Sequence, residues 1–335
     1  MKKTLLLLII FALFGSVATW YLLTQQDEKT TLSAKNQRFA IEDPDEIYKI
    51  FIADRKGGTT TLERKNTHWL YNGKYKARQN AMDNLLDAIT RVQVKYKPPT
   101  AAVDNMVKDL SANGLKVELY NDNNKLIKTY YVGGATPDER GTYMIMEGSN
   151  QPYVTYIPSW EGNLRFRYNL TDEDWRDKII FAYNQDDIQA VSIEYPKQRN
   201  QSFRLERSGN DFQIKPFYGT TPTINSSVNL GKVEAFLEGF KSLGAEAFEN
   251  ENPRRDSILQ LVPFSIITVA DKAGNATVVR LFPIIPLQDP ANPRLPNADV
   301  VERYFLDWNG QDFMLIQHRV FSKVLWGYDF FFEKK

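Results

Sequence analysis

The chain contains few residues of the types on which most enzymes and metal sites depend. Among its 335 residues there is no cysteine, and His68 and His318 are the only histidines. Disulfides, thiolate nucleophiles, iron–sulfur clusters, cysteine-based zinc sites and a lipidated cysteine are therefore excluded. Neither a glycine-rich nucleotide loop nor a G-x-S-x-G nucleophile motif occurs. We therefore expect no catalytic residue, no cofactor and no metal site.

Acidic residues gather at three places, and paired carboxylates could serve glycoside hydrolysis or hold Ca²⁺. The clusters are residues 43–46, 172–174 and 186–187. None of them has the D-x-[DN]-x-[DN]-G spacing of a calcium loop. Thr171 before the second cluster is typical of a helix N-cap, and we interpret the other two clusters as solvated loops.

The overall charge argues against nucleic acid as a partner. Lys and Arg number 42 against 41 Asp and Glu, which leaves a formal net charge of +1 and no general attraction for polyanions. A local basic group could still bind anionic headgroups or an acidic partner, although we interpret it as a solvated face. Its members are Arg64, Lys65, Lys74, Lys76, Arg78, Arg91, Lys95 and Lys97.

Period-two alternation and turn signals predict a chain built mainly of strands. Strands are expected at 47–53, 59–64, 67–71, 115–120, 126–132, 142–147, 153–157, 188–195, 201–207, 211–215, 264–270, 276–282, 302–307 and 312–316. Helical spacing is confined to 79–92, 101–111 and 228–243. Antiparallel sheets with a few packed helices define an α+β fold.

The second half of the chain follows the template of the first, which predicts two tandem related repeats. Ile50 and Ile52 match Val191 and Ile193, Trp69 matches Phe212, and the pair 85–86 matches 236–237. Each repeat is expected to be an antiparallel sheet with one or two helices. The expected divisions are 1–24 as membrane anchor or signal peptide, 25–40 as polar linker, 41–183 as first repeat and 184–335 as second repeat.

The N-terminus predicts export from the cytoplasm. Residues 5–23 carry no charge, and as a helix they would be about 28 Å long, close to the membrane hydrocarbon thickness. Lys2 and Lys3 precede this segment, so the positive-inside rule places the rest of the chain outside the cytoplasm. Cleavage after Ala18 is the alternative. We favour a retained single-pass anchor in a bacterial inner membrane, with the bulk of the chain in the periplasm.

Prolines crowd the sequence between two predicted strands near the C-terminus. The cluster consists of Pro283, Pro286, Pro290, Pro293 and Pro296. Because proline lacks the N–H that a strand ladder needs, this stretch should be a loop. Long loops of this kind often bind partners, so these five residues are our candidate partner-contact loop, with plain insertion as the alternative.

Several segments resemble one family, the domain-of-unknown-function family 4340 of Bacteroidota. They are residues 49–55 (KIFIADR), 69–76 (WLYNGKYK), 130–134 (YYVGG), 141–144 (GTYM), 172–178 (DEDWRDK), 247–253 (AFENENP) and 302–305 (ERYF). The resemblance implies an envelope protein with an N-terminal membrane segment, accessory to an ABC-type transport or gliding-related complex. It carries no catalytic motif.

Three functions remain open, in order of preference. The first is a membrane-anchored, non-enzymatic interaction module whose partner is a protein, such as an ABC-type transporter subunit. The second is an exported glycan-, peptide- or lipid-binding protein that uses a groove between the repeats. The third is a carboxylate-based hydrolase, which needs two acidic groups that face each other across a cleft.

Overall fold

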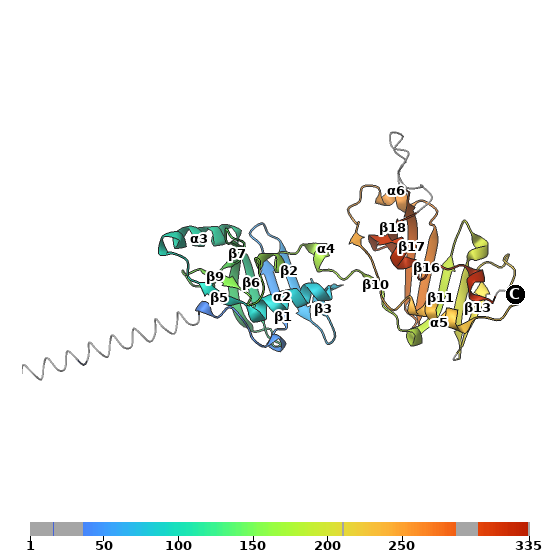
Figure 1. Cartoon of the computed structure of the whole chain (residues 1–335), viewed down its shortest axis with the longest axis horizontal. Helices are drawn as coiled ribbons and strands as arrows, with labels where there is room; N and C mark the ends of the chain where they lie inside the picture. Colours follow the sequence, from blue (N-terminus) through green and yellow to red (C-terminus); the bar gives the residue numbers. More distant parts are fainter. Residues whose placement is uncertain (1–15, 17–35, 210, 286–300, 334–335) are drawn as a thin grey trace, which may run out of the picture. The chain divides into compact units, whose positions relative to one another are not determined.

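A computed structural model describes residues 16, 36–209, 211–285 and 301–333 (Figure 1). The chain forms two compact units, Met1–Asp177 and Lys178–Lys335. Each unit is a mixed α/β structure with a mostly antiparallel sheet and few helices. Within the described ranges no helix is both long and apolar enough to cross a membrane. The predicted span 5–23 lies outside those ranges, Ser16 excepted.

Unit 1 contains a nine-stranded sheet with the order β4-β3-β2-β1-β6-β7-β8-β9-β5. Its strands are β1 Lys49–Ala53, β2 Thr59–Arg64, β3 Trp69–Tyr71, β4 Tyr75–Lys76, β5 Gln93–Tyr96, β6 Leu115–Tyr120, β7 Leu126–Ala135, β8 Thr142–Met146 and β9 Tyr153–Tyr156. Between β3 and β4, Asn72 and Gly73 have φ angles of 48° and 67°. This left-handed pair is what a two-residue hairpin turn requires.

The two faces of this sheet carry different helices. On one face, α2 (Gln79–Arg91) buries Met82, Leu85 and Ile89 completely. On the other, α3 (Thr100–Asn113) contributes Leu110, which lies against Gly133 of β7. Val132, the neighbour of Gly133, belongs to the α2-side core, and successive strand residues point to opposite faces. Short helices complete the unit: η1 Pro44–Glu46, η2 Arg165–Arg167 and α4 Asp172–Trp175.

Unit 2 contains an eight-stranded sheet with the order β13-β12-β11-β16-β17-β18-β19-β15, and a separate pair, β10–β14. The strands are β10 Ile179–Phe181, β11 Ile188–Glu194, β12 Phe203–Ser208, β13 Asp211–Pro216, β14 Leu243–Gly244, β15 Ala247–Phe248, β16 Ser265–Asp271, β17 Ala276–Ile284, β18 Arg303–Trp308 and β19 Asp312–Gln317. The helices are η3 Gln185–Asp187, η4 Arg199–Gln201, α5 Leu230–Glu238, α6 Arg255–Leu259, α7 His318–Phe321 and η5 Tyr328–Phe331.

Helix α5 is shorter than the predicted helix 228–243. It begins after Asn229, whose side chain accepts a hydrogen bond from the Lys232 amide at 3.1 Å, and it ends before Gly239. A Cβ at Gly239 would lie only 2.8 Å from Val324 Cγ1, so the chain packs closely here. The apolar pattern continues to Leu243 because that residue stays in the core, but it does so in β14 rather than in a helix.

The prediction that Pro283 belongs to a loop was wrong, because it lies in β17 opposite Tyr304 of β18. Ser265, the first residue of β16, pairs with Leu281, so Pro283 lies beyond the end of β16. Strand β17 therefore has a neighbour on one side only at this point, which is where a strand tolerates proline. The other four prolines of the candidate loop lie outside the described residues.

Candidate functional site

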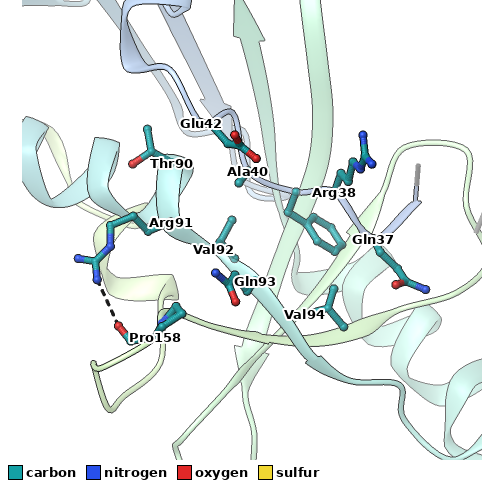
Figure 2. Close-up of a pocket in the computed structure, with 11 residues that line it drawn as sticks. Gln37, Arg38, Ala40, Glu42, Thr90, Arg91, Val92, Gln93, Val94 and Pro158 are labelled. Atoms are coloured by element: carbon teal, nitrogen blue, oxygen red, sulfur yellow. Dashed lines mark hydrogen bonds between the residues drawn. The ribbon is translucent and has the colours of Figure 1, made fainter. Parts of the chain in front are cut away.

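Unit 1 contains a pocket of about 780 Å³ between two segments that are distant in sequence (Figure 2). One wall is formed by residues 37–40 and Glu42, which precede the first strand. The other is formed by residues 90–94, where α2 ends and β5 begins. Pro158 also lines the pocket. Its volume is in the range of small-ligand sites, so we treat it as the candidate site.

The first wall is fixed in position by the packing of Phe39 in the core and by hydrogen bonds to Lys128. Phe39 is 1% exposed, and its ring meets that of Tyr130 edge-on at 6.1 Å. Lys128 Nζ donates hydrogen bonds to the carbonyl oxygens of Arg38 at 2.9 Å, of Phe39 at 3.3 Å and of Ala40. Burial and the nearby charge of Arg38 lower the pKa of Lys128. Three successive carbonyl groups thus point towards one ammonium group.

The second wall is held by Arg91 at the end of α2. Its Nη1 donates to Asp87 Oδ1 at 2.8 Å, and its Nη2 donates to the Pro158 carbonyl at 3.2 Å, the dashed line in Figure 2. Asp87 also accepts from Arg167 Nη1 at 2.6 Å. Burial alone would raise the pKa of Asp87, but the hydrogen bonds from Arg167 and Arg91 outweigh it and lower the pKa. This wall is therefore fixed by ionised groups.

The pocket lies at an edge of the sheet. Strand β5 pairs with β9 and with no other described strand, and Gln93 and Val94 of β5 line the pocket. Ile41 donates a backbone hydrogen bond to Ile89 at 3.2 Å beside it. The lining thus offers a ligand two guanidinium groups, one carboxylate, two carboxamides and a strand edge, which are groups suited to binding polar or peptide-like molecules.

The two histidines lie in separate units, outside this pocket. His68 Nδ1 lies 3.3 Å from the Thr67 hydroxyl next to it in the chain. His318 is exposed, and its Nδ1 lies 3.1 Å from the hydroxyl of Tyr304. These contacts give each imidazole a hydroxyl neighbour.

The three acidic clusters have structural partners. Asp45 of the first pairs with Arg64 at 2.7 Å, and Asp172 of the second accepts from the Tyr71 hydroxyl at 2.6 Å. Asp187 of the third accepts from Asn184 at 3.0 Å. Across the described part of the chain, no group of three or more His, Asp or Glu residues could hold a metal ion.

The basic residues of unit 1 divide into separate ion pairs. Arg64 binds Asp45, Lys65 binds Glu63 at 3.3 Å, Lys76 binds Asp177 at 3.0 Å and Arg91 binds Asp87. Half of the group is therefore neutralised locally.

Sequence reasoning missed the pocket because its two walls looked unremarkable. Residues 37–40 were expected to end a polar linker, yet Phe39 is buried in the core. Strand β5, with the sequence QVKY, is too short and too polar to show a strand pattern. The one usable signal was Phe39 itself, an aromatic residue in an otherwise polar stretch.

Comparison with known proteins places the chain in a family. No curated protein and no solved structure matches it. The sequence model of the family described as "Domain of unknown function (DUF4340)" matches residues 69–261, which are more than half of the chain. The match begins in β3 and extends past α6, so it includes most of unit 1 and the first part of unit 2. The chain therefore belongs to the DUF4340 family of domains of unknown function.

Proposed function

We propose that this chain is a membrane-anchored envelope protein of Bacteroidota type that acts as a non-enzymatic interaction module. Residues 5–23 would cross the inner membrane once and leave both units in the periplasm. The uncharged run, with Lys2 and Lys3 before it and Asp27 as the first charge after it, supports this orientation. We further propose that the segment is retained rather than cleaved after Ala18.

The proposal includes an origin of the two units by duplication. Without the edge strand β4, the sheet of unit 1 has eight strands. The main sheet of unit 2, which does not include the β10–β14 pair, also has eight. When these eight strands are numbered by their order along the chain, both sheets have the same spatial order, 3-2-1-5-6-7-8-4. A shared order of this complexity supports descent from one ancestral unit, each copy with its own core.

A group of exposed apolar residues carries the partner-binding part of the proposal. Leu261 and Val262 are 60% and 56% exposed just before β16, and Ile285 is 60% exposed just after β17. The beginning of β16 and the end of β17 lie at the same end of their antiparallel ladder. We call these three residues the apolar rim. Clustered exposed apolar side chains are typical of protein contact sites.

Four of the five prolines of the candidate partner-contact loop follow this rim in the chain, and the fifth, Pro283, lies in β17. Pro283 is exposed beside Ile285 at the end of β17, and Pro286, Pro290, Pro293 and Pro296 follow in the chain. The partner proposed from the family resemblance is a subunit of an ABC-type transport or gliding-related complex. The rim would supply apolar contact area, and the prolines would add contacts at low entropic cost.

Purification of the full-length chain from its native membrane in mild detergent, followed by mass spectrometry, tests this function. We expect intact N-terminal peptides and an ABC-type subunit that is lost in the variant Leu261→Lys/Ile285→Lys. The matched control is Leu126→Lys/Ile127→Lys, which changes two exposed apolar residues of unit 1 and should retain the subunit. A soluble chain that begins at Thr19, or a subunit retained by the rim variant, would contradict the proposal.

A further inference from the structure

In unit 2, the segment that precedes the first strand of the main sheet pairs with the segment that follows helix α5, in a short antiparallel ladder. Phe181 of β10 pairs with Leu243 of β14, and Ile179 pairs with Gly244. Backbone bonds extend the contact on both sides, from Tyr183 N to Phe240 O at 3.0 Å and from Ala245 N to Lys178 O at 2.8 Å. Strand β14 lies between helix α5 and edge strand β15.

In unit 1, the two segments at the corresponding chain positions do not form a ladder with each other. Residues 37–41 precede the first strand, and residues 92–94 directly follow helix α2, with Gln93 and Val94 as the first two residues of edge strand β5. The bond from Ile41 N to Ile89 O corresponds to the Tyr183–Phe240 bond of unit 2. Beyond this bond, where unit 2 has the β10–β14 ladder, unit 1 has the 780 Å³ pocket.

The side chains of the two separated segments stay in the core. Phe39 and Val92 are 1% and 3% exposed, as Phe181 and Leu243 of unit 2 are fully buried. Only the backbones differ, and Lys128 explains why. Carbonyl groups of a strand alternate in direction, whereas those of residues 38–40 all point to Lys128 Nζ. Residues 38–40 therefore cannot form a regular ladder with residues 92–94.

No other described segment pairs with residues 92–94 on the side opposite β9, and this edge lies at a pocket of about 780 Å³. An open strand edge is a template for an added strand, and addition of an extended peptide is a recurring mode of recognition. We propose that this pocket binds an extended peptide segment of a partner protein, which pairs with residues 92–94. Arg91 already pairs with Asp87, whereas Arg38 lines the pocket without an ion pair to any described residue; the peptide that we propose therefore carries an acidic side chain opposite Arg38.

This inference rests on the proposed function, an interaction module, and names one of its contact sites. Its test is selection of a random nonapeptide display library on the full-length chain in detergent. Enriched peptides should alternate β-forming residues and contain Asp or Glu. Their binding should slow amide hydrogen exchange at residues 92–94. Arg38→Glu should weaken binding about tenfold or more, the effect expected for loss of a charge-assisted contact, and Lys215→Glu on edge strand β13 should not.

A photo-crosslinking residue at position 93 gives a second readout in native membranes. The matched control is position 213, because Gln93 and Gln213 are both exposed glutamines on edge strands. A cross-link from 93 to an acidic segment of another protein, absent from 213, supports the site.

Four results would overturn the inference. They are an unenriched library, peptides that bind Arg38→Glu as well as the parent chain, cross-links from 93 only to residues 24–35 of the same chain, and slow exchange at 92–94 without peptide. The last would mean that unit 1 closes as unit 2 does. If no peptide binds but the ABC-type subunit still co-purifies, the peptide site is rejected and the proposed function stands. If the subunit does not co-purify either, the proposed function is rejected as well.

Discussion

Arg167 Nη1 and Asp87 Oδ2 lie 2.6 Å apart, in a pair that joins η2 to α2 across 80 residues of sequence. The Arg167 side chain is only 6% exposed, and its guanidinium also lies over the Trp160 ring at 4.5 Å. The same carboxylate binds Arg91 on the wall of the pocket. One aspartate therefore compensates a buried charge and positions a pocket residue.

Removal of this carboxylate should destabilise unit 1. Asp87→Ala leaves the buried Arg167 guanidinium without its counter-ion, and we expect a loss of about 2 kcal/mol in the free energy of unfolding, below the range for fully buried pairs because Asp87 is partly exposed. Urea denaturation monitored by tryptophan fluorescence measures it. Asp83→Ala is the control, since Asp83 is exposed on the same helix and its carboxylate accepts a hydrogen bond from Gln79 at 2.8 Å. Equal losses in the two variants would refute the role of Asp87.

Glu118 should make the stability of unit 1 depend on acid. Its carboxylate binds Lys116 Nζ at 2.7 Å and the Tyr120 hydroxyl, and these hydrogen bonds lower its pKa. A lowered folded pKa means that the stabilisation is present above the unfolded value of about 4.3 and is lost as the pH falls through the folded pKa. Glu118→Gln should therefore cost about 1 kcal/mol at neutral pH, and the difference from the parent chain should shrink in acid.

Unfolding measured across a pH series checks this expectation. Glu63→Gln is the comparison, because its ion pair with Lys65 at 3.3 Å is exposed on both sides and such pairs contribute little. If the difference in the free energy of unfolding between Glu118→Gln and the parent chain stays constant down to the lowest pH of the series, the ionisation of Glu118 is not the source of that difference.

Two adjacent glycines should respond differently to the same substitution. A Cβ at Gly133 would lie 2.6 Å from Leu110 Cδ2 and 3.1 Å from the Tyr143 carbonyl oxygen, whereas one at Gly134 would meet nothing within 4 Å. Gly133→Ala should thus displace α3, with a loss of about 1–2 kcal/mol from overpacking. Gly134→Ala should be close to neutral. Hydrogen exchange in α3 should accelerate in the first variant alone, and unchanged exchange there would contradict the close packing.

Elements with strong local signals could be predicted from the sequence alone. Asn72-Gly73 and Asn309-Gly310 both adopt the left-handed φ pair of tight hairpins, because few other residues tolerate that conformation. The helical spacing over 79–92 appears as α2, since one apolar stripe must face the sheet. The predominance of antiparallel strands follows from the same alternating pattern. For these features the relevant interactions lie within a few residues of each other.

Tertiary structure decided the rest, because the necessary contacts join distant segments. Strands β5 and β14 contain four and two residues, too few for a pattern, and they exist because β9 and β10 lie beside them. The pocket depends on Lys128, whose ammonium group reaches carbonyl groups 88 to 90 residues earlier in the chain. No local preference encodes that contact. It forms only when β7 has taken its place in the sheet and brings the lysine beneath the first wall.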